Sequence, residues 1–459
     1  MKINIAESSK KINQKIILQG WVSNLRIHKS VIFIDLRDRS AIIQAVIEET
    51  NPSFLIAKNL NPEDVISLEG VVIDRPNKLV NKDLITGKVE FKIHKITILS
   101  KSAELPFEIS DTSKVNEETR LEYRYLDLRS KRMQKNLEMR HKIIHFIRNY
   151  LNDLGFLEVE TPILTKSTPE GARDFLVPSR IDQGNFYALP QSPQQYKQLL
   201  MVAGIEKYFQ IARCFRDEDS RGDRQPEFTQ LDMEMSFIEQ EDILQISEKL
   251  FTDLIKKILP DFTITKKPFF RLTYNESMKK YGTDKPDLRN NKNNPKELAF
   301  GFVVDFPMFE KDKNGQWTSA HHPFTMMKKE HLKYLNTGEL NKIFANSYDF
   351  ILNGYEIASG SIRINQPEIQ KKVFNVLGFN NEQVIKKFGH MIEAFKFGAP
   401  PHGGIAPGID RFVMLIQNEP NIREVIAFPK TGEGRDPMMK SPSQTDSTQL
   451  KELGIKIKQ

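Results

Sequence analysis

Two neighbouring runs of sequence decide the fold: Arg213-Cys214-Phe215-Arg216-Asp217-Glu218-Asp219 and Gln225-Pro226-Glu227-Phe228-Thr229-Gln230-Leu231-Asp232-Met233-Glu234. They predict a strand, a loop and a second strand. Asp232 and Glu234 share one face of the second strand, because strand side chains alternate. Arginines beside carboxylates indicate a binding site for a nucleoside triphosphate, held by the arginines and by magnesium on the carboxylates. If these two runs stood alone, a charged strand edge with no ligand would explain them as well.

Two later segments favour the nucleotide interpretation. Asn353-Gly354-Tyr355-Glu356-Ile357-Ala358-Ser359-Gly360-Ser361-Ile362-Arg363-Ile364 predicts two strand pieces around a bend, with Glu356 suited to metal or ribose and Arg363 to a carboxylate. In Gly403-Gly404-Ile405-Ala406-Pro407-Gly408-Ile409-Asp410-Arg411-Phe412, glycines permit close approach to a flat ligand. Arg411 opens a predicted helix over 412–417, and arginine both stacks on rings and grips phosphates.

Three motifs of these types, in this order, resemble the signature motifs of class II aminoacyl-tRNA synthetases. Gly155-Phe156-Leu157-Glu158-Val159-Glu160-Thr161-Pro162 is similar to the remaining motif, which builds the dimer interface in that class. Within the class, further segments resemble bacterial aspartyl-tRNA synthetases: Ser167 to Asp174, Leu189 to Lys197, His321-His322-Pro323-Phe324 and Phe428-Pro429-Lys430. The resemblance runs from Gly20 to Gly454. It implies ATP, L-aspartate and tRNA as substrates, and a homodimer.

The resemblance also implies roles for residues at the nucleotide. Arg216 would hold the α-phosphate, and Arg411 would stack on adenine or grip the γ-phosphate. Asp349 and Glu356 would bind Mg²⁺, a cation that prefers hard oxygen ligands. Arg216, Glu356 and Arg411 form the expected catalytic set. The expected ATP contacts are Arg216, Asp217, Glu218, Gln225, Glu356, Gly408, Ile409, Asp410 and Arg411.

For the amino acid, the resemblance implies that Lys197 and Arg363 receive the side-chain carboxylate. Arginine can meet a carboxylate with a bidentate fork, which distinguishes it from an amide. Glu170 and Gln194 would receive the ammonium, Arg216 would contact the substrate, and His321, with or without His322, would close over it. Taken alone, the histidine pair could cap a turn and Lys197 could be a solvated helix lysine.

Composition sets outer limits. The 459 residues are too many for one compact core and predict two or three domains. The single cysteine, Cys214, excludes an intrachain disulfide and a thiolate cluster and favours a reducing cytoplasm. We find no apolar run long enough to span a bilayer, and we expect neither a membrane nor DNA as a partner. The formal charge is +7.

The first 105 residues show five short β-branched runs and one helical stretch over 52–59, which predicts a five-stranded barrel of the oligonucleotide-binding type. This region carries 16 Lys and Arg against 12 Asp and Glu, so it holds four of the seven excess charges. An anticodon of tRNA is the partner that the resemblance implies, through Arg26, His28, Phe33 and Gln44. From periodicity alone, Phe33 could equally be a core residue.

A connector over 106–132 follows, and then a catalytic domain over 133–459. Its strands and helices lack regular βαβ alternation, which predicts an α+β domain with an antiparallel sheet flanked by helices. Neither a dinucleotide fingerprint nor a P-loop is present. Bacterial relatives carry an inserted domain near this chain's 287–297, where only a short polar linker remains.

Three interpretations stay open. Aspartate–tRNA ligation is the main one, and His28 adds the hypothesis that both the aspartate and asparagine tRNAs are charged. An asparaginyl-type enzyme is the first alternative; two cations at 197 and 363 would repel the ammonium of lysine, which argues against a lysyl enzyme. A catalytically inactive RNA-binding paralogue is the second, although Arg216, Glu356 and Arg411 are all present.

Overall fold

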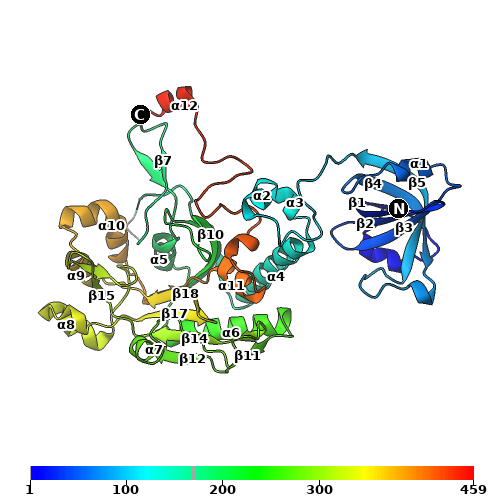
Figure 1. The fold of residues 1–459 in the computed structure, drawn as a ribbon. Coiled ribbons are helices and arrows are strands. Elements are labelled where there is room, and N and C mark those ends of the chain that lie inside the picture. Colours follow the sequence, from blue (N-terminus) through cyan, green and yellow to red (C-terminus); the bar gives the residue numbers. More distant parts are fainter. Residues whose placement is uncertain (1, 168–170, 459) are drawn as a thin grey trace. The chain divides into compact units, whose positions relative to one another are not determined.

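The computed structural model describes residues 2–167 and 171–458. The chain forms two compact units, Met1–Thr112 and Ser113–Gln459, whose elements are labelled in Figure 1. The boundary between the two units, after Thr112, falls inside the connector expected over 106–132.

The first unit is a closed five-stranded barrel, which confirms the predicted fold. Its strands follow the order β1-β2-β3-β5-β4 around the barrel. A short helix, α1 (Phe54–Lys58), precedes β4. In β2, Ile32, Ile34 and Leu36 are fully buried, so Phe33 and Asp35 point to the outer face. The strands are β1 (Lys15–Ile27), β2 (Val31–Arg37), β3 (Ile42–Glu48), β4 (Val65–Asp74) and β5 (Val89–Ser100).

The second unit is built on an eight-stranded sheet. Its six central strands are antiparallel, as predicted, but the outermost strand at each edge pairs in parallel, so the sheet is mixed. Each edge strand is joined to its neighbour by a long connection containing a helix, which parallel pairing requires. The order is β12 (Phe270–Thr273), β14 (Phe300–Val304), β17 (Ser347–Leu352), β18 (Tyr355–Ile362), β19 (His402–Ile405), β10 (Glu227–Ser236), β9 (Lys207–Phe215) and β6 (Leu157–Glu158).

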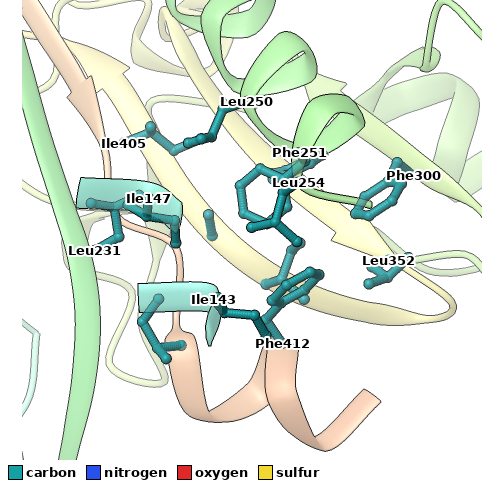
Figure 2. Close-up of a cluster of buried hydrophobic side chains, with 14 of the residues drawn as sticks. Ile143, Ile147, Leu231, Leu250, Phe251, Leu254, Phe300, Leu352, Ile405 and Phe412 are labelled. Carbon is teal, nitrogen blue, oxygen red and sulfur yellow. The ribbon is translucent and has the colours of Figure 1, made fainter. Parts of the chain in front are cut away.

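One face of this sheet carries the main hydrophobic core. Helices α4 (Lys131–Asp153), α6 (Gln240–Ile258) and α11 (Ile409–Ile416) contribute apolar side chains to it. Figure 2 shows Phe251 and Phe412 meeting within this cluster, with ring centroids 5.0 Å apart. Leu231 and Met233 of β10 face the core. Asp232, the residue between them, must therefore face the opposite side of the sheet.

The opposite face is covered in part by α5 (Gln194–Val202), which contacts β10. Helices α9 (Pro367–Val376) and α10 (Asn381–Phe395) pack against each other, and α10 also contacts α5. The remaining helices are α2 (Glu117–Glu122), α3 (Arg124–Asp127), α7 (Tyr274–Tyr281), α8 (Leu332–Thr337) and α12 (Ser447–Glu452). None of the helices in the described part of the chain is long and apolar enough to cross a membrane.

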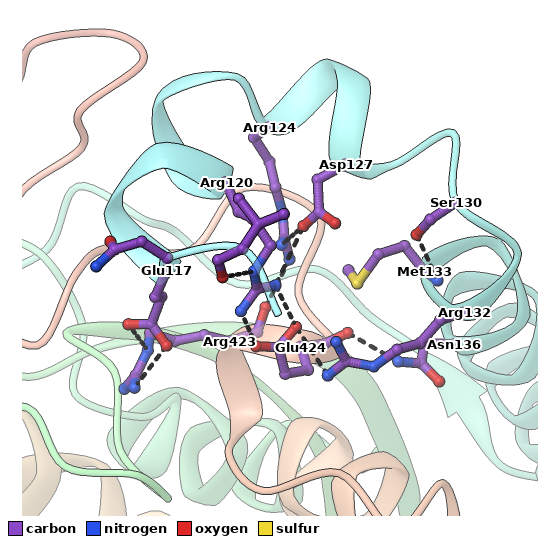
Figure 3. A network of polar contacts seen from close by, with 12 residues as sticks. Glu117, Arg120, Arg124, Asp127, Ser130, Arg132, Met133, Asn136, Arg423 and Glu424 are labelled. Atoms are coloured by element: carbon purple, nitrogen blue, oxygen red, sulfur yellow. Dashed lines mark hydrogen bonds and ion pairs between the residues drawn. The ribbon is translucent and has the colours of Figure 1, made fainter. Parts of the chain in front are cut away.

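A buried polar network ties α2 and α3 to the segment that follows α11 (Figure 3). Arg120 forms two hydrogen bonds with Glu424, of 2.9 and 2.8 Å. Arg124 donates to the backbone carbonyls of Arg423, Ile426 and Ala427. Burial alone would raise the pKa of Glu424, but the arginines outweigh it, so its pKa lies below the ordinary value. The network holds a turn whose Ile422 lines the cavity described next.

Candidate functional site

A cavity of about 420 Å³ opens on the sheet face opposite the main core. It is bounded by α5, by the loop between β9 and β10, by β18 and by the start of α11. Its size lies in the range typical of small-molecule sites. Eleven of the residues predicted from the sequence line it: Gln194, Lys197, Arg216, Glu218, Gln225, His321, Glu356, Arg363, Gly408, Asp410 and Arg411.

The buried side chains of Lys197, Arg363 and Asp232 form the floor of the cavity, and the buried carboxylate of Glu234 pairs with both cations. The Nζ of Lys197 lies 2.7 Å from Oδ1 of Asp232 and 3.3 Å from Oε2 of Glu234. Arg363 Nε lies 2.9 Å from Oε1 of Glu234. The spacing of Asp232 and Glu234 placed them on one face, but the sequence did not identify them as partners of these cations. Charges this deeply buried are tolerated only when paired.

The guanidinium of Arg363 is largely engaged already, which corrects the expectation of a free bidentate fork. Nε and Nη2 donate to Glu234, at 2.9 and 3.1 Å. Nη1 lies 2.7 Å from both Ser361 Oγ and His322 Nε2. Within the described structure, these contacts occupy four of the five N–H groups of an arginine. A ligand carboxylate would therefore meet the charge of Arg363 and a single remaining N–H.

Glu234 reaches Arg363 across the intervening strand β19 because Gly404 has no side chain. Glu234 is paired with Gly404 in the sheet register. A Cβ at residue 404 would stand 2.0 Å from Oε2 of Glu234. Glycine is thus required at residue 404 because the Glu234 side chain passes so close to the backbone. The sequence had suggested a different reason, which was close approach to a ligand.

The protonation of this floor follows from burial and charge. Burial raises the pKa of Asp232. Burial also opposes the charge of Glu234, but Arg363 and Lys197 outweigh it and hold its pKa below the ordinary value. Burial and the Arg363 cation lower the pKa of His322 well below its usual range. His322 is therefore neutral, and its Nε2 accepts a hydrogen bond from Arg363.

The other end of the cavity presents groups suited to a polyphosphate. Arg216 lies over the ring of Phe228, 5.1 Å from its centroid. Arg411 contacts the carbonyl of Glu356 and lies 3.1 Å from a carboxylate oxygen of Asp223, a partner that the sequence did not suggest. Gln225 accepts a hydrogen bond from the Lys430 amide, at 2.8 Å. Its buried Nε2 has no hydrogen-bond partner within the described residues and is a donor available to a ligand.

Three predicted ATP contacts are placed differently from the expectation. Ile409 packs its side chain into the hydrophobic core, so only its backbone could reach a ligand. The carboxylate of Asp410 accepts from the backbone N–H of Thr229, at 2.7 Å, and is bonded to Arg140, which gives it a structural role. Asp217 lies outside the cavity, in a neighbouring depression. Glu170, expected at the ammonium, falls outside the described residues.

Glu356 lines the cavity, and the buried carboxylate of Asp349 lies near enough to feel its charge. Burial, and then the charge of Glu356, raise the pKa of Asp349 well above its ordinary value. Oδ1 of Asp349 is buried and has no hydrogen-bond partner in the described structure. Such a pair fits a divalent cation. Over the described ranges, no group of three His, Cys, Asp or Glu could hold a metal, so a cation here would need ligands from a bound phosphate.

His321 lies beside this pair. Its Nδ1 is 4.0 Å from Asp349 Oδ1 and 3.3 Å from Ser359 Oγ, and its ring packs edge-on against Phe306. Burial lowers the pKa of His321 to about 4, so its imidazole is neutral at neutral pH. The two histidines of the pair therefore have different neighbours: His321 faces the carboxylates, whereas His322 supports Arg363.

In the barrel unit, the four residues expected at RNA lie together on the outer face. Arg26 bonds Asp35 at 2.7 and 3.0 Å and Gln44 at 3.2 Å. The Phe33 ring lies 6.0 Å from the Arg26 guanidinium and 5.9 Å from the His28 ring. Phe33 is not a core residue, since the buried side chains of β2 are its neighbours in sequence.

Each of the two units matches a known protein family. Residues 116–432 match the family described as tRNA synthetases class II (D, K and N), and residues 16–99 match the family described as OB-fold nucleic acid binding domain. The first match covers more than half of the chain. The chain belongs to the class II tRNA synthetases of the D, K and N group.

Curated relatives cover nearly the whole chain. An aspartate–tRNA(Asp/Asn) ligase of Dehalococcoides mccartyi is 41% identical, over 98% of each chain. An aspartate–tRNA ligase of Macrococcus caseolyticus is 40% identical, over 97% of this chain and 96% of the relative. The first alignment spans 588 positions, whereas this chain has 459 residues. The relative therefore contains segments that have no counterpart here.

Solved structures share the fold. An asparaginyl-tRNA synthetase of Pyrococcus horikoshii, complexed with asparaginyl-adenylate, superposes with a TM-score of 0.75 at 23% identity, over 94% of this chain and 98% of that one. An aspartyl tRNA synthetase of Entamoeba histolytica gives a TM-score of 0.71 at 24% identity, over 92% and 89%.

Proposed function

We propose that this chain is an aspartate–tRNA ligase, which activates L-aspartate with ATP and transfers it to the 3′ end of tRNA. The observation that carries the proposal is the pair of buried cations, Lys197 and Arg363, in the floor of a cavity whose other end holds Arg216 and Arg411. Relatives with this activity at about 40% identity over the full chain support it.

The reaction needs no enzyme nucleophile. An oxygen of the substrate α-carboxylate attacks the α-phosphorus of ATP, and pyrophosphate leaves with the electron pair of the broken P–O bond. A terminal ribose hydroxyl of tRNA then attacks the acyl carbon, and AMP leaves. Catalysis is therefore positioning and neutralisation of phosphate charge. Arg216 is suited to the α-phosphate and Arg411 to the nucleotide. Gln225 Nε2 supplies a further donor, and Glu218 and Gly408 line the same end of the cavity.

Selection of aspartate follows from the charge of the floor. Lys197 and Arg363 are balanced by Asp232 and Glu234 in the absence of substrate, so the added side-chain carboxylate meets cations whose positions are already fixed. Oδ2 of Asp232 has no hydrogen-bond partner in the part of the chain described and would accept from the substrate ammonium. Gln194 would be a second acceptor. A side-chain amide would place N–H donors against Lys197, which disfavours asparagine.

Mg²⁺ is the proposed cofactor, held by Asp349 and Glu356 together with phosphate oxygens. When bound, it would neutralise charge on the triphosphate. The pKa of Asp349 is raised by burial and by the charge of Glu356, so a bound cation would stabilise its ionised form. Mg²⁺ with a non-hydrolysable ATP analogue should raise the unfolding temperature of the wild-type protein by more than that of Asp349→Asn. An equal rise in both would reject this site.

The barrel is proposed to bind the tRNA anticodon. Phe33 offers a face for stacking, and Arg26 and Gln44 offer groups that read base edges, which is the usual mode for single-stranded RNA. His28, exposed beside Phe33, motivates the hypothesis that both the aspartate and asparagine tRNAs are charged. Purified asparagine tRNA should accept aspartate, and absence of any charging rejects dual specificity.

A homodimer and a cytoplasmic location complete the proposal. The segment 155–164 exposes apolar side chains, with Leu157 53% and Leu164 52% exposed, which is typical of a surface covered by a partner. Light scattering should give twice the chain mass of 53.1 kDa. A monomeric mass would remove this part of the proposal.

The direct test is aspartylation. Purified protein with ATP, Mg²⁺ and aspartate tRNA should form aspartyl-tRNA, and Arg216→Ala should not. An inactive RNA-binding paralogue would bind the tRNA without charging it, which would leave the barrel assignment intact and reject the enzymatic one.

A further inference from the structure

Three buried polar side chains form a chain that ends at the cavity. Gln194 Nε2 donates to Gln198 Oε1 at 3.0 Å, and Gln198 Nε2 lies 3.2 Å from His402 Nε2. His402 Nδ1 lies 2.8 Å from the carbonyl oxygen of Pro400. Gln198 and His402 are fully buried, and Gln194 is 7% exposed. Of the three, only Gln194 lines the cavity.

The direction of each hydrogen bond follows from the Pro400 carbonyl. A carbonyl oxygen can only accept, so Nδ1 of His402 carries a proton and donates it. Burial lowers the pKa of His402 from its ordinary value, so the ring is neutral and Nε2 is an acceptor. Gln198 must therefore turn its NH₂ towards His402 and its carbonyl towards Gln194. Gln194 must in turn direct its own NH₂ towards Gln198.

We propose that His402 and Gln198 are positioning residues that fix the amide of Gln194, so that its carbonyl Oε1 faces the cavity as an acceptor for the α-ammonium of the amino-acid substrate. This inference rests on the proposed function. A reversed Gln194 amide would direct N–H donors at a cation. An amide can bind in either orientation, so Gln194 alone would not guarantee an acceptor in the cavity. Gln198 removes this ambiguity, because its own amide is oriented by His402 and the Pro400 carbonyl.

The same histidine also connects the two ends of the amino-acid site. Its backbone carbonyl accepts from the N–H of Arg363 at 2.9 Å. His402 thus contacts the backbone of Arg363, which is proposed to bind the side-chain carboxylate. Through Gln198 it also contacts Gln194, which is proposed to bind the ammonium. This placement fits a shared positioning role.

The experiment compares aspartate with succinate, which carries both carboxylates but no ammonium. Gln198→Met has a similar volume, no N–H donor and only a weakly accepting sulfur, so Gln194 loses the neighbour that orients its amide. In aspartate-dependent ATP–pyrophosphate exchange, we expect the KM for aspartate to rise about 10-fold, as for loss of one hydrogen bond to a charged group. The KM for ATP and the inhibition constant of succinate should change less than about 2-fold on the same reasoning.

If Gln198→Met only loosened the pocket, the binding of succinate and of aspartate would weaken alike, and that result would overturn the proposal. An unchanged KM for aspartate would also overturn it. His402→Phe removes the acceptor by an independent route and should again affect aspartate selectively.

Ser277→Ala is the matched control, since it removes the side-chain hydrogen bond of a fully buried serine outside the cavity. It should leave the KM for aspartate unchanged. Failure of the proposed function is distinguishable, because the wild-type protein would then show no aspartate-dependent exchange before any variant is compared.

Discussion

The ammonium of Lys197 lies 2.7 Å from a carboxylate oxygen of Asp232, and both side chains are buried in the cavity floor. This contact means that the cation is held in place before any substrate arrives. A buried pair of this kind contributes little net stability relative to apolar residues, but removing one partner is costly. We therefore interpret the pair as a device that positions positive charge for a ligand.

Lys197→Met should weaken aspartate binding by about 100-fold or more, because a buried charge contact to the substrate is lost. It should also lower the free energy of unfolding by about 3–5 kcal/mol, because Asp232 and Glu234 lose their partner. The double variant Lys197→Met/Asp232→Asn should recover part of the stability but none of the aspartate affinity. If the double variant recovers both, Lys197 does not bind substrate.

Arg216→Ala should reduce the rate of pyrophosphate exchange by about 10²–10³, the loss expected for a contact that strengthens in the transition state. The protein should remain folded, since Arg216 is only partly buried. Arg213→Ala is the control: this arginine lies on β9, three residues before Arg216 and outside the cavity, and it pairs with Glu227. Equal losses in both variants would contradict a specific role for Arg216.

Glu424→Gln should lower the free energy of unfolding at pH 7 by about 3–5 kcal/mol, because it removes the charged partner of Arg120 in a buried network. The folded-state pKa of Glu424 is lowered, so its contribution is present above the unfolded pKa of about 4.3. That contribution is lost as the pH falls through the lower folded value. The gap between wild type and variant in urea unfolding should therefore narrow in acid.

The control for this prediction is Glu393→Gln, whose exposed pair with Lys396 should contribute at most about 1 kcal/mol. If the difference in free energy of unfolding between the wild type and Glu424→Gln widened in acid, the predicted pH dependence would be wrong.

Phe33→Ala should weaken tRNA binding by about 1–3 kcal/mol, the usual contribution of one stacked base. It should leave aspartate-dependent pyrophosphate exchange unchanged, because that reaction involves no tRNA. Binding is measured by filter retention at fixed salt. Phe237→Ala, which removes an exposed aromatic ring of the second unit, should bind tRNA as the wild type does; a comparable loss there would show that the effect is not specific to the barrel.

The sequence was sufficient to predict those elements that depend on a local pattern of residues. Alternation of β-branched residues predicted the barrel strands, and the spacing of Asp232 and Glu234 predicted a shared face. Contacts between distant segments were not predictable. Glu234 reaches Arg363 only because Gly404 lies between their strands, and the carboxylate of Asp410 is bonded to Arg140, 270 residues away.

The parallel edge strands were missed for a related reason. Leu157–Glu158 and Phe270–Thr273 are short, and neither periodicity nor composition indicates the direction of the strand that each one meets. Gln198 and His402, 204 residues apart, carry no motif that would bring them together. Their role depends on packing between α5 and the start of β19.

Amino-acid-dependent ATP–pyrophosphate exchange by the purified wild-type protein is the measurement closest to the central claim, since it requires only the cavity, ATP and the amino acid. Aspartate, asparagine and lysine are compared at equal concentration. The buried cations predict exchange with aspartate and none above background with the other two. Exchange with asparagine or lysine, or no exchange with aspartate, would contradict the account.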